Sequence, residues 1–172
     1  THSAQESPFD GICGLAFPEI SLPPGVLPPF DMLFKQKLVE KFEFSFFLST
    51  VNGKPDAGKS ALILGGYDNK YCDGAACDFT YHPLDVAQHA LGYWLIRGSD
   101  IKADGKTLGM CPAGLGCQFV VDTGTSILVG PKNRIAPLIA LANKTGTIAK
   151  DGTMDCALES TLPVLTFEID LG

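Results

Sequence analysis

The stretch Phe119-Val-Val-Asp-Thr-Gly-Thr-Ser-Ile-Leu-Val-Gly-Pro131 places one acidic residue, Asp122, between two apolar runs. The apolar runs predict a buried strand that leads into a loop, and Gly124 allows a sharp reversal of the chain. The Thr and Ser hydroxyl groups in the loop can donate hydrogen bonds to a carboxylate. Because a buried carboxylate is costly without partners or a role, Asp122 is the residue that we expect to carry out chemistry.

The composition predicts an all-β fold, β-rich with a few short helices. The 172 residues include 19 Gly and 12 Pro, which indicate many turns, and the 45% hydrophobic content is typical of a globular core. The net charge of −6 argues against a nucleic-acid partner, because nothing would neutralise a phosphate backbone. No apolar run approaches the roughly 18 residues of a membrane span, and residues 1–6 do not resemble a signal peptide. Any leader is therefore expected outside this sequence.

Four of the six cysteines form two closely spaced pairs, Cys72 with Cys77 and Cys111 with Cys117. Two small disulfide loops or one four-thiolate zinc site could explain them. We favour the disulfides, because turn residues fill both loops and the spacings are looser than in a zinc knuckle. Disulfides imply an oxidising compartment. The sequon Asn143-Lys144-Thr145 agrees with secretion.

Apolar periodicity and turn residues predict the other elements. Strands are expected at residues 9–18, 42–51, 61–68, 79–84, 92–96 and 162–169, and helices at residues 29–41 and 131–143. Asp104-Gly105 predicts a hairpin turn, which makes Asp104 a turn residue and not a catalyst. Pro137 inside the second helix predicts a late start or a kink.

Other hydrolytic chemistries have little support in the sequence. The histidines, at positions 2, 82 and 89, do not form a His-Glu-x-x-His motif, and the sequence contains no Gly-x-Ser-x-Gly motif. The segment 109–116 lacks the Lys of a phosphate-binding loop. We therefore expect no metal and no cofactor.

The Asp122 stretch resembles the second catalytic loop of pepsin-like aspartic proteases. Phe9-Asp-Gly-Ile-Cys-Gly-Leu-Ala16 resembles the element that closes their N-terminal lobe, and Gly92-Tyr-Trp94 resembles the opening of the strand before the second loop. The resemblance implies a bilobal, β-rich acid protease fold whose double-psi barrel lobe is incomplete here. Residues 1–60 would end the N-terminal lobe and cross over, and residues 61–172 would form an incomplete C-terminal catalytic lobe.

The resemblance also assigns roles within the loop, residue by residue. Asp122 would be the second catalytic aspartate, and Thr123 would make the hydroxyl contact that joins the two Asp-Thr-Gly turns. Gly124 would pair its backbone with substrate, and Thr125 would hydrogen-bond the carboxylate. Ser126 would contact substrate further along the cleft.

Four further residues would contact substrate according to the same resemblance. Phe9 and Ile12 would line the pocket for the residue before the scissile bond, and Val120 the pocket after it. Tyr93 would line the primed side of the cleft. In the alternative interpretation, the apolar side chains belong to an ordinary core.

The two remaining cysteines are expected to be unpaired. Cys13 stands where the family has Leu, so we expect a buried thiol that acts as a small hydrophobic residue. Cys156 matches a family cysteine whose partner comes later in the chain.

Hydrolysis by carboxylates alone requires two of them sharing one proton, as is established for aspartic proteases and not inferred from this sequence. The first lobe's aspartate, the flap and the closing strand have no counterpart in the 172 residues. We therefore expect an internal fragment, inactive alone, whose partners are polypeptide substrates and the missing N-terminal lobe. The parent would be an endopeptidase of a secretory, extracellular or lysosome-like acidic compartment.

Two alternative functions remain open at the level of sequence. A pepsin-like relative that has lost catalysis would use the cleft as a peptide-binding module. A retropepsin-like homodimer would bring one Asp-Thr-Gly from each subunit to a two-fold axis, although the closing strand that it needs after the loop is not found.

Overall fold

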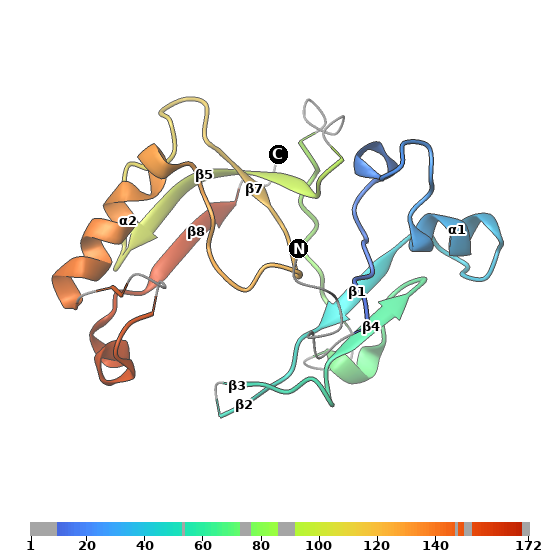
Figure 1. The fold of residues 1–172 in the computed structure, drawn as a ribbon, viewed down its shortest axis with the longest axis horizontal. Coiled ribbons are helices and arrows are strands. Elements are labelled where there is room, and N and C mark those ends of the chain that lie inside the picture. Colours follow the sequence, from blue (N-terminus) through green and yellow to red (C-terminus); the bar gives the residue numbers. More distant parts are fainter. Residues whose placement is uncertain are drawn as a thin grey trace. The chain divides into compact units, whose positions relative to one another are not determined.

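The computed structural model describes residues 10–52, 54–72, 77–85, 92–146, 148–149 and 153–169. The chain divides into two compact units, Thr1–Thr80 and Tyr81–Gly172. The described strands form two two-stranded sheets and one four-stranded sheet, with a few short helices (Figure 1). This architecture confirms the predicted fold class. The lobe boundary expected at residue 60 remains a prediction.

The first unit is built from short elements around aromatic side chains. They are η2 (Pro18–Ile20), α1 (Pro29–Lys35), β1 (Phe44–Phe47), β2 (Thr50–Val51), β3 (Lys54–Pro55), β4 (Ala61–Leu64) and η3 (Asn69–Tyr71). The strands β1 and β4 pair antiparallel, as do β2 and β3. Phe30 of α1 is buried, and its ring stacks on Phe42 and meets the edge of Phe44.

Helix α1 ends six residues before the predicted end. Lys37 adopts a left-handed conformation with φ of 58°, and its N–H donates to the carbonyl of Phe34. The N–H of Leu38 donates to the carbonyl of Leu33. This pair of bonds is a Schellman motif, which satisfies the last helical carbonyls and turns the chain away. The predicted helix over residues 29–41 was therefore too long.

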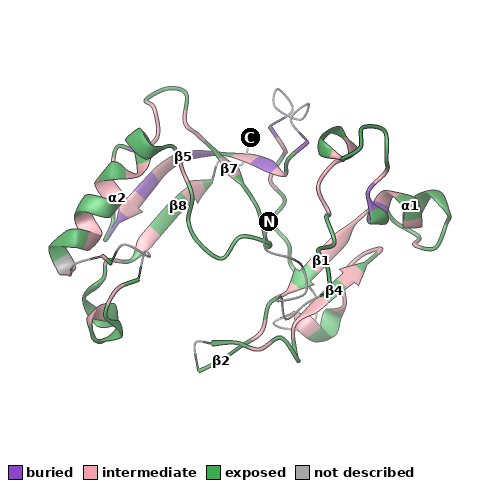
Figure 2. Cartoon of the chain, viewed as in Figure 1, coloured by how far each residue is buried: buried purple, intermediate pink, exposed green. Residues whose placement is uncertain are grey.

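The second unit is organised around the long strand β5. Its elements are β5 (Leu95–Ala103), β6 (Lys106–Thr107), β7 (Cys117–Val120), α2 (Lys132–Thr145), η5 (Cys156–Thr161) and β8 (Leu165–Ile169). Strand β5 pairs antiparallel with β6, β7 and β8. Its residues Leu95, Ile101 and Ala103 are buried (Figure 2). Gly98 is buried as well, so the burial alternates strictly only from Ile101 to Ala103, beyond the register shift with β8 between Gly98 and Asp100.

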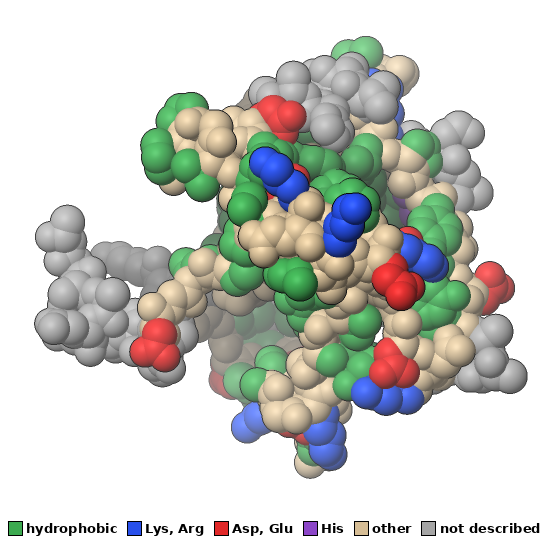
Figure 3. Space-filling model, turned by 90° about the vertical axis from the view of Figure 1, so that its right-hand side faces the viewer, with side chains coloured by type: hydrophobic (Ala, Val, Ile, Leu, Met, Phe, Trp, Pro, Cys, Tyr) green, Lys and Arg blue, Asp and Glu red, His purple; other side chains and the backbone are tan. Residues whose placement is uncertain are grey.

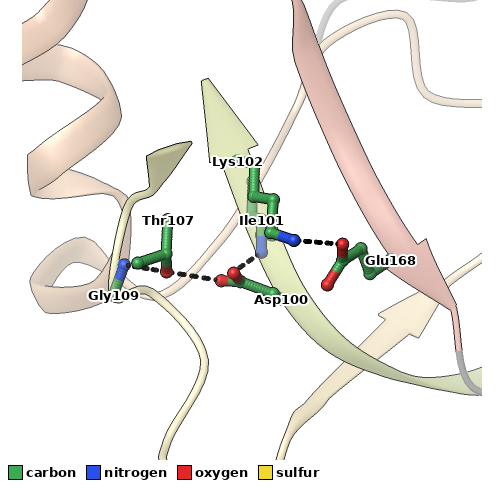
Figure 4. Close-up of polar contacts among 6 residues, drawn as sticks. All are labelled: Asp100, Ile101, Lys102, Thr107, Gly109 and Glu168. Carbon is green, nitrogen blue, oxygen red and sulfur yellow. Dashed lines mark hydrogen bonds and ion pairs between the residues drawn. The ribbon is translucent and has the colours of Figure 1, made fainter. Parts of the chain in front are cut away.

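Polar contacts reinforce the outer strands on β5. Lys102 forms an ion pair with Glu168 of β8 (Figure 4). The hydroxyl of Thr107 donates to Oδ1 of Asp100 at 2.8 Å, and the N–H of Gly109 donates to the Thr107 hydroxyl at 3.2 Å. These contacts hold β6 and β8 to the same strand.

The turn at Asp104-Gly105 has the predicted geometry. Both residues have positive φ, 46° and 75°, as the favoured two-residue hairpin turn requires. The turn is also tied to a distant segment, because Asp104 and Val164 exchange two hydrogen bonds of 3.0 Å. The prediction that Asp104 is a turn residue is confirmed.

Helix α2 also departs from its prediction in one respect. It begins at Lys132, directly after Pro131, and continues through Pro137 to Thr145. The late start that Pro137 was expected to cause is therefore absent, and the alternative, a kink, remains a prediction. Pro137 removes the N–H that would pair with the carbonyl of Asn133. Because Asn133 is exposed, water can solvate this carbonyl.

Several predicted strands are shorter or absent among the described residues. Residues 10–17 contain no strand, and Ile12 is 89% exposed. Residues 79–84 contribute a single bridge, between Leu84 and Ile96. Cys13 is exposed, so the prediction of a buried thiol was wrong. The surface in Figure 3 likewise carries many hydrophobic side chains between charged ones.

The two disulfides, Cys72–Cys77 and Cys111–Cys117, are both present, which confirms the disulfide interpretation. Cys156 is free and exposed, as is Cys13. Within the described residues, no group of three or more metal-ligating side chains occurs. No helix in the described part of the chain is long and apolar enough to cross a membrane.

Candidate active site

The Asp122 loop begins where β7 leaves the sheet. Val120 of β7 lies opposite Leu95 of β5 in the antiparallel register. The N–H of Val121 donates to the carbonyl of Trp94 at 2.9 Å, which extends the pairing by one residue. Asp122 is the next residue, so the sheet positions the backbone immediately before it.

The Asp122 carboxylate is held by its own loop. Oδ1 accepts the backbone N–H of Gly124 at 2.8 Å, and Oδ2 accepts the hydroxyl of Thr125 at 2.5 Å. A Cβ on Gly124 would lie 3.2 Å from Oδ1, which is tighter than ordinary contact. Glycine at this position therefore lets the backbone approach the carboxylate closely.

These hydrogen bonds lower the pKa of Asp122 below its ordinary value. The Thr125 hydroxyl has the larger effect and the Gly124 N–H the smaller, because both donors favour the charged carboxylate. The loop thus presents an oriented carboxyl group to solvent and favours its charged form.

The apolar runs on either side of Asp122 are not buried, contrary to the sequence-based prediction. Val120 is 52% exposed and Ile127 is 71% exposed, and Val121, Leu128 and Val129 are also exposed. Strand β7 lies at an edge of the described sheet, so no described strand covers its outer side. An apolar sequence pattern shows what a segment can pack against, and packing requires a neighbour.

Some of the other expected site residues lie in the same unit as Asp122, and others do not. Thr123 and Ser126 are exposed in the same loop, and Tyr93 is exposed just before Trp94. Ile12 belongs to the other unit. Phe9 lies outside the described residues. The structure thus groups the loop residues with Val120 and Tyr93 in one unit.

The chain after the loop is tied to helix α2. The carbonyl of Pro131 accepts the N–H groups of Arg134 at 2.7 Å and Ile135 at 3.1 Å. A Cβ on Gly130 would lie 2.7 Å from Ile135, so glycine permits this close approach. Both ends of the Asp122 loop are therefore connected to regular structure.

Asp85 is a buried acidic residue that no sequence pattern indicated. The side chain of Asp85 is 4% exposed, and its Oδ2 accepts hydrogen bonds from Arg97 at 3.1 Å and Gln118 at 2.8 Å. Its backbone N–H donates to the carbonyl of Leu95 at 2.9 Å. Asp85 thus joins the chain before β5 to both β5 and β7. No sequence motif predicts these contacts, because the two partner residues lie in separate strands.

Comparison with known proteins gives the family. The family model for eukaryotic aspartyl proteases matches residues 1–171. The chain belongs to that family. Cathepsin D of Clupea harengus is 40% identical over 162 residues, which is 94% of this chain. Pepsin A of Sus scrofa is 38% identical over 164 residues, or 95% of the chain.

The chain spans little more than a third of the aspartyl proteases that it matches. The alignment covers 37% of the herring cathepsin D and 39% of the pig pepsin A. Cathepsin D of Homo sapiens, 40% identical over 163 residues, is covered over 36% of its length. The resemblance to pepsin-like aspartic proteases is thus confirmed, and the β-rich architecture is consistent with part of their fold.

Proposed function

We propose that this chain forms part of an aspartic endopeptidase in which Asp122 is one of two catalytic carboxylates. The supporting observation is the oriented Asp122 carboxylate, held by Gly124 and Thr125, in a chain of the aspartyl protease family. The 172 residues contain a single Asp-Thr-Gly. The second carboxylate must therefore come from residues outside this motif.

In the proposed reaction, two close carboxyl groups share one proton. The ionised member accepts a proton from water, and the water oxygen attacks the scissile carbonyl carbon while the neutral member polarises the carbonyl oxygen. The C–N bond then breaks, and the leaving amine takes up a proton. The lowered pKa of Asp122 applies to this chain without a second catalytic carboxyl group. In the dyad, the two carboxyl groups would titrate as a pair.

The remaining loop residues would position the dyad and the substrate. Thr123 would join the Asp122 loop to its partner loop, and Gly124 would hydrogen-bond substrate through its backbone. Ser126 would contact substrate further along the cleft. Their exposure in this chain is compatible with such contacts.

Four side chains would form substrate pockets in the same proposal. Val120 and Tyr93, exposed on the unit that carries Asp122, would contact the residues after the scissile bond. Ile12, exposed on the other unit, would line the pocket before it together with Phe9. Apolar pockets of this kind favour cleavage between bulky apolar residues.

The substrates would be polypeptides, and the compartment would be acidic and reached by the secretory pathway. The two disulfides support this route, because such bonds persist in oxidising compartments. Acidic solution would keep one member of the dyad protonated. Extracellular and lysosome-like compartments both meet these conditions.

We expect the 172-residue chain alone to be inactive, because one carboxylate cannot share a proton. The test compares the purified chain with the full-length protein on a peptide that has bulky apolar residues at its centre, at acidic pH. The full-length protein should cleave the peptide, and a transition-state analogue should inhibit it.

Each alternative function predicts a different outcome of that assay. A non-catalytic relative would bind the analogue without cleaving the peptide, even at full length. Cleavage by the chain alone, with sedimentation as a dimer, would instead support the homodimeric protease and refute the proposed requirement for a further lobe.

A further inference from the structure

Asn143 in helix α2 begins an acceptor sequence for N-linked glycosylation, Asn143-Lys144-Thr145, that the proposed proteolysis does not use. The other asparagines, at positions 52, 69 and 133, are not followed by Ser or Thr two residues later. If this chain carries an N-linked glycan, Asn143 is therefore the one position that the sequence offers.

Asn143 is accessible to solvent. Asn143 is exposed in the last turn of α2, and its Oδ1 accepts the N–H of Ile148 at 3.4 Å. A glycan is attached through the amide nitrogen, Nδ2, so this hydrogen bond to Oδ1 can persist in the modified protein. The local structure thus leaves Asn143 exposed, with its hydrogen bond to Ile148 made through Oδ1 and not through the nitrogen that would be modified.

An exposed apolar stripe leads along α2 to the same residue. Ala136, Ile139 and Ala140 precede Asn143 by seven, four and three positions, which places all four residues on one face of the helix. All three apolar residues are exposed, and Ile139 is 44% exposed. A sugar on Asn143 would lie beside this stripe and reduce its contact with water and with other chains.

The disulfides are independent support for the required route. Cys111–Cys117 in the same unit as Asn143 forms in an oxidising compartment, and eukaryotic N-glycosylation occurs in the same secretory pathway. The sequon is compatible with glycosylation, because its middle residue is Lys and not Pro.

We propose that Asn143 carries an N-linked glycan. The donor would be an oligosaccharide joined to a lipid diphosphate, as supplied by the secretory pathway. A bond forms between Nδ2 of Asn143 and the anomeric carbon of the first sugar, and the bond from that carbon to the diphosphate breaks. The amide nitrogen loses one proton, and the lipid diphosphate leaves with the bonding electron pair.

The attachment point is separated from the Asp122 loop by most of helix α2. Helix α2 follows this loop and has 14 residues, which makes it roughly 20 Å long at about 1.5 Å per residue. Asn143 lies near the end of the helix that is distant from Pro131. Glycosylation is therefore compatible with access to the candidate active site.

The experiment expresses the full-length protein through the secretory pathway of a eukaryotic cell. The peptide that contains Asn143 is analysed by mass spectrometry before and after enzymatic removal of N-linked glycans in heavy-oxygen water. The expected result is a glycopeptide that becomes a peptide with labelled aspartate at position 143. An unmodified Asn143 in secreted protein with an intact Cys111–Cys117 bond would overturn the proposal.

Three variants separate the sequon from other effects on α2. Thr145→Ala should abolish the glycan although Asn143 is retained, and Thr145→Ser should preserve it. Asn133→Gln, on the same helix and outside any sequon, should leave the glycan unchanged. A glycan on Asn143 that survives Thr145→Ala would contradict the assignment. Because Thr145→Ser and Asn133→Gln keep the sequon, a folding defect in one variant cannot account for the full pattern.

Discussion

Two aspartates in this chain, Asp104 and Asp122, occupy glycine-containing turns after strands and are used in opposite ways. The Asp104 side chain accepts the N–H of Val164, 60 residues later, and so fastens the β5–β6 turn to the chain before β8. The Asp122 side chain bonds only within its loop among the described contacts, to residues two and three positions later.

The comparison shows how partner distance separates a structural carboxylate from a candidate catalytic one. A carboxylate that fastens two segments must keep its partner, and its loss weakens the fold. A carboxylate oriented by its own loop remains exposed and available to a second group. The two aspartates therefore predict different responses to mutation.

The largest expected effect concerns activity. In the full-length protein, Asp122→Asn should lower kcat/KM for a peptide by about 10²- to 10⁴-fold or more, because an amide cannot accept the proton from water. Asp104→Asn is the matched control, and it should leave kcat/KM nearly unchanged. Equal losses in the two variants would remove the functional distinction between the turns.

The next effect concerns the strand that supports both turns. A Cβ at Gly98 would lie 2.2 Å from the Phe119 ring and 2.5 Å from the carbonyl oxygen of Glu168. Gly98→Ala should therefore lower the local free energy of opening of β5 by about 1–3 kcal/mol, measured by amide hydrogen exchange.

Gly58→Ala provides a control for Gly98→Ala, because its Cβ would meet Asp56 at an ordinary 3.5 Å. This change should alter stability by less than about 0.5 kcal/mol. Unchanged exchange of the β5 amides in Gly98→Ala would contradict the close packing of β7 and β8 on this strand.

A smaller effect is expected at Asp104 itself. Asp104→Ala removes the acceptor of the Val164 N–H and places Ala at a φ of 46°, which together should cost about 1–2 kcal/mol. Hydrogen exchange of the Val164 amide should accelerate accordingly. Asp104→Asn keeps the acceptor and tolerates the conformation, so its exchange should stay near that of the unchanged protein.

The smallest effect sharpens the comparison at Asp122. Thr125→Val removes the main donor that lowers the pKa of Asp122, so this pKa should rise toward the ordinary value of about 3.9. Carboxyl NMR titration of the chain measures the change. Thr123→Val is the control in the same loop, and it should leave the pKa of Asp122 unchanged.

The sign of the stability effect follows from the lowered pKa. A carboxyl group whose pKa is lower in the folded state stabilises the fold above its unfolded pKa, and this contribution is lost as the pH falls through the folded pKa. Thr125→Val should therefore weaken the pH dependence of stability in the acidic range. A pKa of Asp122 that falls in Thr125→Val would refute the role of the hydroxyl.

Much of the fold could be predicted where neighbouring residues carry the signal. The Asp104-Gly105 turn, strand β4, most of helix α2 and the two disulfides were all expected. In each case the residues that determine the structure lie within a short segment. The end of α1 was missed although it is also local, because the Schellman motif uses Lys37, where Gly is the usual signal.

The environment of the candidate site was predicted less well. The identity of the Asp122 loop followed from its residues. Val120 and Ile127 were predicted to be buried and are exposed, because burial depends on strands that must lie beside them. The Asp85 cluster was not found at all. Its partners Arg97 and Gln118 are 12 and 33 residues away, and no local pattern links them.

The sequence by itself determined the family resemblance, the disulfide loops and the chemistry of the Asp122 turn, whose hydrogen bonds join residues two and three positions apart. Such contacts depend on a few backbone torsions and on the residue types present. Only the tertiary structure decided that Gly98 must accommodate Phe119 and the Glu168 backbone, and that Asp85 is buried against two strands. Those outcomes depend on which strands pair, and strand pairing joins segments that no local pattern connects.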